Sequence, residues 1–155
     1  MATEIERKFL VVGDGWRSAV TGHSDIRQAY LSVTDVNTVR VRTHGSTAFL
    51  TVKSADSGMT RQEFEFPIPI ADAEALFALR KGRMIEKRRH LVSAGSLRWE
   101  IDVFAGELDG LVIAEIELPS EQTNFARPEW LGEEVTGKAR YGNAYLATGD
   151  MPDRR

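Results

Sequence analysis

Polar and apolar residues alternate in many short runs along this chain, and such alternation is typical of β-strands with two unlike faces. In the first run, Glu4, Glu6 and Lys8 share one face. The other face carries Ile5, Phe9 and Val11 and is interrupted by Arg7. Clusters of Gly, Asp, Ser and Thr separate the runs. The pattern predicts strands at approximately 3–12, 25–33, 36–43, 47–54, 59–69, 83–92, 96–105 and 111–118. Because most connections have hairpin length, we expect mostly antiparallel pairing.

Helical signals are few. An alanine-rich stretch at 70–79 follows two prolines and has acidic residues near its start, which predicts a short helix. Weaker signals predict a short helix at 16–20, a helical turn at 128–131, an extended piece at 134–136 and a last helix at 138–148. Because helices and strands do not alternate, we expect the helices to cover the outside of the sheet, and the predicted fold class is α+β.

The polar faces of the predicted strands carry more charge than a solvated sheet face needs. The acids on these faces are Glu4, Glu6, Glu63, Glu65, Glu100, Asp102, Glu115 and Glu117, and the bases are Lys8, Arg40, Arg42, Lys53, Arg61, Lys87 and Arg89. Any one strand alone is consistent with an ordinary outer face. The recurrence of charge pairs at i and i+2 favours a closed or nearly closed sheet with a charged interior and an apolar, helix-covered exterior.

A charged interior of this kind is costly when empty, because clustered like charges lose their hydration. Two unit charges 4 Å apart interact by about 4 kcal/mol at an effective dielectric constant near 20. Carboxylates suit a hard divalent cation, and Lys and Arg suit phosphate oxygens. A divalent cation together with a polyphosphate would therefore satisfy both sets of charges.

Length and composition narrow the class of protein further. The 155 residues are enough for one domain with a sizeable core, and the formal net charge of −3 gives no overall basic field, so we expect no nucleic-acid partner. The absence of cysteine excludes disulfides, thiolate metal sites and a cysteine nucleophile. No signal peptide or membrane span is recognisable, so we expect a cytoplasmic protein without a membrane partner, as a monomer or homodimer.

Several sequence blocks, in order, resemble those of one known family. Residues 4–8 match an E-x-E-x-K signature, and further matches lie at 28–31, 39–42, 50–54, 61–65, 87–89, 99–104, 110–117, 130, 134–136 and 141–143. Together they resemble the CYTH superfamily, the triphosphate tunnel metalloenzymes. One departure is His90, where many relatives carry tyrosine. The resemblance covers a single domain at 1–148 and leaves 149–155 as a tail that we expect to be frayed.

The resemblance implies an eight-stranded antiparallel tunnel that binds triphosphates with Mg²⁺ or Mn²⁺. The implied metal ligands are Glu4, Glu6, Glu115 and Glu117, with Asp102, Glu63 and Glu65 at a second metal position or its surroundings. The implied phosphate-binding residues are Lys8, Arg40, Arg42, Lys87 and Arg89, with Arg61 as a sixth. Lys53 and Tyr30 match a pair expected near the attacked phosphorus. The alternatives are that Glu63, Glu65 and Glu100 pair with arginines, and that Tyr30 is a half-buried strand residue.

The implied function is metal-dependent hydrolysis of a triphosphate, most simply inorganic tripolyphosphate to pyrophosphate and phosphate. The reasons for this substrate are the short chain and the lack of an obvious aromatic set for stacking an organic ring, although Phe49 and Trp16 remain candidates. The alternatives are a thiamine triphosphatase, a class IV adenylate cyclase, and a polyphosphate- or nucleotide-binding module without turnover.

Overall fold

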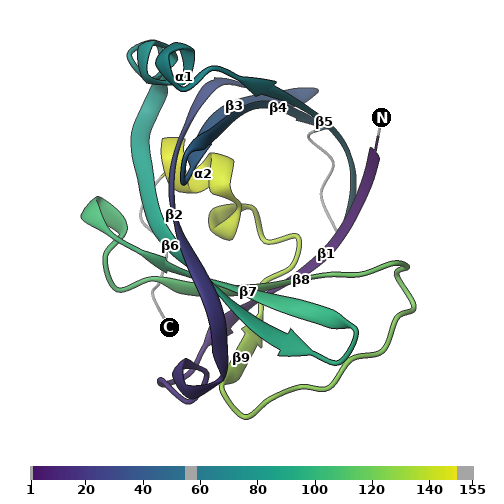
Figure 1. Ribbon diagram of the computed structural model, residues 1–155. Coiled ribbons are helices and arrows are strands. Elements are labelled where there is room, and N and C mark those ends of the chain that lie inside the picture. The colour runs from purple at the N-terminus through teal and green to yellow at the C-terminus, as the bar shows by residue number, and fades with distance from the viewer. Residues whose placement is uncertain (1, 55–58, 150–155) are drawn as a thin grey trace.

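The protein is a closed antiparallel β-barrel with one added strand (Figure 1). The computed structural model describes residues 2–54 and 59–149, so the expected tail lies outside these ranges from residue 150 onward. The strands are β1 (Ala2–Val11), β2 (Val20–Val33), β3 (Asn37–His44), β4 (Thr47–Ser54), β5 (Thr60–Ile68), β6 (Lys81–Ala94), β7 (Leu97–Phe104), β8 (Val112–Glu117) and β9 (Leu131–Glu134).

The barrel closes between the first and fifth strands. The order β5-β4-β3-β2-β6-β7-β8-β1 returns to its start because β1 also pairs with β5, and every ladder is antiparallel. This confirms the predicted eight-stranded antiparallel barrel. The prediction underestimated β2 and β6, which have 14 residues each and pair along most of their length.

The last strand was not predicted as such. Strand β9 pairs with β1 at Phe9 and Val11, where a helical turn and a later extended piece were expected. On the outer face of β1, Arg7 donates hydrogen bonds of 2.8 and 2.5 Å to the Glu134 carboxylate, and its guanidinium lies 5.2 Å from the Phe125 ring. This ion pair explains why a charged residue interrupts the apolar face of β1.

Helix α1 (Ile70–Phe77) covers the outside of the barrel, as predicted. Its buried residues Ala73 and Phe77 pack against Ala29, Val41 and Ala48 of the neighbouring strands β2, β3 and β4. The helix begins after Pro69, which is extended at the N-cap position. The predicted helix at 16–20 is a single 3₁₀ turn, η1 (Arg17–Ala19). None of the described helices has the length and apolar character needed to cross a membrane.

Helix α2 (Asn143–Thr148) closes one end of the barrel, where it lies across the opening in Figure 1. The expected helix at 138–148 is divided at Gly142 into the 3₁₀ turn η3 (Ala139–Tyr141) and α2. Leu146 of α2 packs with Leu10, Ile85 and Ile113, which continue the faces of β1, β6 and β8 that carry Lys8, Lys87 and Glu115. The interior is therefore charged along part of its length and apolar beneath α2.

Gly82 allows α2 to approach β6 closely, and Gly82→Ala should be strongly destabilising. Its φ is +80°, and an added Cβ would collide with the backbone carbonyl of Ala147. We expect the free energy of unfolding to fall by about 2–3 kcal/mol, because the substitution adds backbone strain and a clash. Gly95→Ala is the matched control, since φ there is +64° but nothing lies within 4 Å of the added Cβ. Urea denaturation that shows equal losses for both variants would contradict the proposed contact.

Candidate active site

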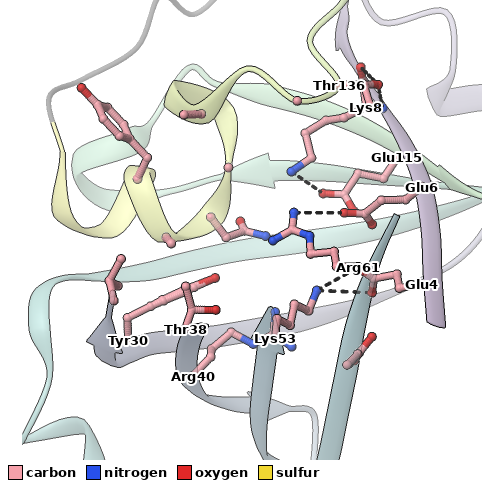
Figure 2. Close-up of a pocket in the computed structure, with 18 of the residues that line it drawn as sticks. Glu4, Glu6, Lys8, Tyr30, Thr38, Arg40, Lys53, Arg61, Glu115 and Thr136 are labelled. Carbon is pink, nitrogen blue, oxygen red and sulfur yellow. Dashed lines mark hydrogen bonds and ion pairs between the residues drawn. The ribbon is translucent and has the colours of Figure 1, made fainter. Parts of the chain in front are cut away.

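A cavity of about 470 Å³ occupies the charged part of the barrel interior (Figure 2). Thirteen of the fifteen predicted site residues line it: Glu4, Glu6, Lys8, Tyr30, Arg40, Arg42, Lys53, Arg61, Glu63, Glu65, Arg89, Glu115 and Glu117. Lys87 and Asp102 do not line it. Glu100, weighed above only as a pairing residue, also belongs to the lining. The alternation of the strands has therefore brought residues from distant parts of the chain into one cavity.

Strand register places the carboxylates side by side. Glu6 of β1 lies opposite Glu117 of β8, and Glu115 lies between Lys8 of β1 and Glu100 of β7. The acids therefore occupy the contiguous arc formed by β5, β1, β8 and β7. We call these seven residues the carboxylate wall: Glu4, Glu6, Glu63, Glu65, Glu100, Glu115 and Glu117.

Two carboxyl groups of this wall, those of Glu6 and Glu115, lie close enough to affect each other's protonation. Burial, together with the negative charge of Glu115, raises the pKa of Glu6 to about 8. Burial alone would also raise the pKa of Glu115, but Lys8, Arg89 and Lys87 outweigh it and hold that pKa well below its usual value. A cation bound near Glu6 would stabilise its ionised carboxylate, so that Glu6 would no longer need a proton.

Arginines of β3 lie on the opposite arc and lack a full set of partners. Arg40 is only 4% exposed, and its Nε has no hydrogen-bond partner among the described residues. Arg42 donates a 2.7 Å hydrogen bond from Nε to the Gln28 side-chain oxygen, while burial and the neighbouring charges of Arg40 and Arg89 lower its pKa. Buried guanidinium groups that face one another without a carboxylate are suited to binding an anion with several oxygens.

Three cations from β1, β4 and β5 pair with the carboxylate wall instead. Lys53 Nζ lies 3.1 Å from Glu4 Oε1, and Lys8 Nζ lies 3.6 Å from Glu115 Oε1. The third pair, between Arg61 Nη2 and Glu6 Oε1, is longer at 3.9 Å. Figure 2 shows these three side chains pointing toward their carboxylates.

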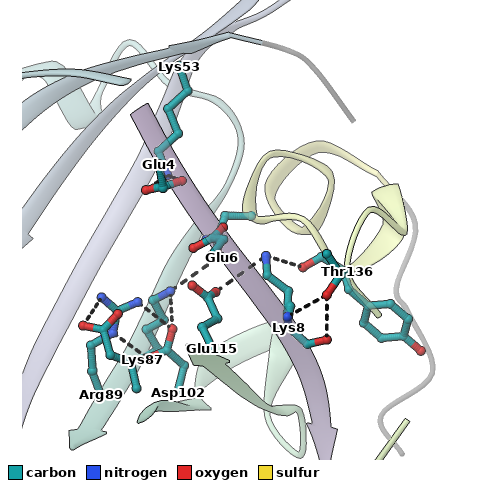
Figure 3. Close-up of polar contacts among 12 residues, drawn as sticks. Glu4, Glu6, Lys8, Lys53, Lys87, Arg89, Asp102, Glu115 and Thr136 are labelled. Carbon is teal, nitrogen blue, oxygen red and sulfur yellow. Dashed lines mark hydrogen bonds and ion pairs between the residues drawn. The ribbon is translucent and has the colours of Figure 1, made fainter. Parts of the chain in front are cut away.

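Lys87, Arg89 and Asp102 form a separate buried cluster (Figure 3). Asp102 accepts hydrogen bonds of 2.8 and 3.0 Å from Arg89, and its other contact is with Lys87 Nζ at 2.6 Å. Burial would raise the pKa of Asp102, but Arg89 and Lys87 together lower it. Arg89 also pairs with Glu100 at 3.3 Å, and pairing with an arginine was the alternative given for Glu100 in the sequence.

The predicted catalytic pair is not joined directly. Tyr30 lines the cavity but is only 5% exposed, and it packs in the apolar cluster beneath α2. Among the described residues, the ammonium of Lys53 has its hydrogen bonds with Glu4 rather than with Tyr30. Tyr30 therefore lines the cavity, as the resemblance implied. It is also a buried strand residue in apolar surroundings, which is close to the alternative interpretation.

Several cavity residues escaped the sequence analysis. Thr38 of β3, Thr136 and Lys138 near β9, and Asn143 of α2 all line the cavity. Asn143 Oδ1 accepts a 3.4 Å hydrogen bond from Lys87, and Thr136 accepts a 2.9 Å hydrogen bond from the Lys8 backbone. The only available signal was the match at 134–136 and 141–143, which indicated family membership but no chemical role.

The donor chemistry of the carboxylate wall fits a divalent cation. Oxygen donors are those that Mg²⁺ and Mn²⁺ prefer, and Glu6 with Glu115 is a close carboxyl pair whose repulsion a cation would relieve. In the part of the chain that the structure describes, however, no three acidic or histidine side chains are grouped closely enough to hold an ion as they stand. The wall therefore has the type of donor atom that a divalent cation prefers, but its carboxylates pair with Lys and Arg in this structure.

The fold is a closed β-barrel with a charged interior cavity, and the chain belongs to the CYTH domain family. The sequence matches this family over residues 2–146. Proteins named inorganic triphosphatase from Acetivibrio thermocellus and Nitrosomonas europaea are 44% and 43% identical to it over 147 and 152 residues. These matches cover 94% of this chain and 94% and 97% of the two relatives.

A solved structure supports the same assignment. The crystal structure of an inorganic triphosphatase superposes with a TM-score of 0.70 at 38% sequence identity, and the match covers 98% of this chain and 99% of that one. The resemblance noted in the sequence is therefore confirmed, as is the predicted barrel.

Proposed function

We propose that this chain is an inorganic triphosphatase that hydrolyses tripolyphosphate to pyrophosphate and phosphate with Mg²⁺ or Mn²⁺. The observation that carries the proposal is the cavity itself, where a carboxylate wall faces Arg40 and Arg42, which form no ion pair with any residue that the structure describes. The relatives named inorganic triphosphatase support the choice of reaction. Together they favour a hydrolase acting on a phosphoanhydride bond.

The chain's own residues bind and orient the substrate. Arg40, Arg42 and Arg89 hold phosphate oxygens in the buried part of the cavity, so that the reacting phosphorus is fixed in position. Glu4, Glu6, Glu115 and Glu117 would hold a divalent cation, which would supply charge neutralisation for the phosphate groups. Lys53, at the opposite side from Arg89, orients the attacking water. The water oxygen bonds to the terminal phosphorus, the bond from that phosphorus to its bridging oxygen breaks with its electron pair, and the water's protons pass to solvent and product.

The surroundings of the cavity favour a substrate without an aromatic ring. Trp16, one of the two candidates for stacking, is buried in the outer apolar cluster with Phe9 and Trp99. Phe49, the other candidate, is not among the residues that line the cavity. The aromatic residues that do line it are Tyr30 and Tyr145, and Tyr30 is engaged beneath α2.

A substrate panel tests the proposal. Phosphate release should be fastest from tripolyphosphate, slower from thiamine triphosphate and ATP, and dependent on added Mg²⁺ or Mn²⁺. Cyclic AMP formed from ATP without phosphate release would instead support a cyclase, and micromolar binding without turnover would support a binding module. Either result would overturn the hydrolase assignment.

Lys53→Ala should reduce kcat more than it raises KM. We expect kcat to fall by about 100-fold, because a group that orients the water acts mainly in the transition state. The measurement is the steady-state rate of phosphate release at several tripolyphosphate concentrations. Arg27→Ala is the control, because it removes an ion pair with Glu74 and a cation–π contact with Phe77, and none of these residues lines the cavity. A higher KM with unchanged kcat would place Lys53 among the substrate-binding residues.

A further inference from the structure

We infer that the divalent cation and the triphosphate bind cooperatively, because in the free protein the cations of the site neutralise its carboxylates. This inference rests on the proposed function, whose ligands it concerns. It adds that neither ligand finds its whole site vacant: at three ion pairs, each ligand must displace charged side chains that the other ligand is suited to take over.

The ion pairs that carry this inference join the two predicted sets of ligands. Lys53 of β4 and Arg61 of β5 pair with Glu4 and Glu6 of β1, at 3.1 and 3.9 Å. Lys8 of β1 pairs with a carboxylate of β8 at 3.6 Å. In each pair, one partner is a predicted metal ligand and the other is a predicted phosphate-contacting residue. Figure 3 shows Lys53 reaching Glu4 at a distance from the Asp102 cluster.

Acidic and basic residues line the cavity in equal numbers. Among the described residues that line it, seven are acids and seven are Lys or Arg. No three of the acids are grouped around a point that could hold a metal ion. A metal ion that binds alone must therefore separate ammonium or guanidinium groups from carboxylates and leave those cations close to itself. A triphosphate that binds alone leaves the carboxylates unpaired and close to its own charges.

When both ligands bind, the pairs exchange partners. The carboxylates turn to the metal ion and the Lys and Arg side chains to the phosphate oxygens, so that no charge is left unpaired. By thermodynamic linkage, each ligand must then raise the affinity for the other by the same factor. Lys53 and Glu4 form the pair best suited to a test, because this is the shortest of the three contacts and both side chains are largely buried.

The cavity also contains charged residues that belong to none of the three ion pairs, and these serve as controls. Lys138 lines the cavity but pairs with Glu133, which does not line it. Glu117 lines it too, and no described residue forms an ion pair or hydrogen bond with its side chain in the structure. Changes at Lys138 and Glu117 alter the cavity charge by one unit without breaking one of the three pairs.

The first experiment measures Mn²⁺ binding without triphosphate, by electron paramagnetic resonance of the free ion. Lys53→Ala should bind Mn²⁺ about five- to tenfold more tightly than the wild type, because the competing ammonium is gone. Lys138→Ala should change the affinity less than twofold. Unchanged or weaker binding by Lys53→Ala, or an equal gain in both variants, would overturn the inference.

The second experiment measures tripolyphosphate binding in EDTA by calorimetry. Glu4→Gln should bind the anion about five- to tenfold more tightly, because Lys53 no longer has to leave a carboxylate. Glu117→Gln removes the same charge and should give a clearly smaller gain. Equal gains would mean that only net charge matters and would overturn the inference. Circular dichroism should confirm that all four variants are folded.

These titrations separate the inference from the proposed function. Hydrolysis is tested by phosphate release from the wild type, whereas the exchange is tested by two binding constants measured without turnover. A wild type that releases no phosphate, together with gains of the expected sign in Lys53→Ala and Glu4→Gln, would overturn the hydrolase assignment and support the exchange.

Discussion

Glu6→Gln should abolish metal-dependent phosphate release and yet leave the barrel folded. Glu6 lies in the centre of the carboxylate wall, opposite Glu117 and close to Glu115. An amide in its place removes a negative charge from the proposed metal site, where a bound cation contributes several kcal/mol of charge stabilisation. We expect kcat/KM to fall by about 1000-fold in Mg²⁺ or Mn²⁺.

The same substitution should stabilise the metal-free protein at neutral to basic pH. The pKa of Glu6 rises from 4.5 to about 8 on folding, first because of burial and then because of Glu115. Between these pH values the folded protein holds a proton that the unfolded chain releases, so stability falls as pH rises through this window. Glu6→Gln lacks this loss, and at pH 8 in EDTA its unfolding free energy should exceed that of the wild type by on the order of 2 kcal/mol.

Two measurements check these opposite effects. Phosphate release gives the loss of activity, and urea denaturation at pH 4.5 and pH 8 gives the gain in stability, which should be present only at the higher pH. Glu74→Gln, on the exposed surface of α1 beside Arg27, should change neither quantity appreciably. Wild-type activity in Glu6→Gln would remove Glu6 from the metal-binding set.

The sequence predicted the interior of the barrel well because the period of a strand is fixed by backbone geometry. Once 4–11 is a strand, Glu4, Glu6 and Lys8 must share one face, and the charged residues of the other strands follow the same rule. The alternation does not predict how far along the barrel axis each side chain lies. Lys87 shares a face with Arg89, yet it lies beyond the cavity beside Phe104 and Asn143. Its position depends on register and on α2, which the alternation does not encode.

Strand β9 shows a second reason for a missed element. Its four residues include Gly132, and both Glu133 and Glu134, which is unusual for a strand read alone. The strand forms because of tertiary contacts. A Cβ at Gly132 would lie 2.9 Å from the Leu10 carbonyl oxygen, so glycine permits the close approach to β1. Glu134 then pairs with Arg7 across the ladder. Neither contact is visible within the segment itself.

Asp102→Asn should cause the largest loss of stability among the site variants. Asp102 is 1% exposed and holds Lys87 at 2.6 Å and Arg89 at 2.8 Å. An amide cannot neutralise these two groups: Arg89 would lose its buried carboxylate partner, and Lys87, whose pKa burial already lowers to about 7, would lose its proton. Removing one partner of a buried ion pair costs about 3–5 kcal/mol. Asp25→Asn is the matched control, because Asp25 pairs with Arg88, the neighbour of both cations on β6, but at an exposed position. Its loss should be far smaller, because solvent screens an exposed ion pair.

Denaturation in EDTA and again with Mn²⁺ separates a structural role of Asp102 from the metal-binding role that the sequence suggested. If Asp102 acts by holding Lys87 and Arg89, Asp102→Asn loses its stability already in EDTA, and Mn²⁺ stabilises the variant as much as it stabilises the wild type. If Asp102 is instead a metal ligand, Asp102→Asn should be about as stable as the wild type in EDTA. Mn²⁺ should then no longer stabilise the variant. The burial of Asp102 between two cations, away from the cavity lining, favours the first outcome.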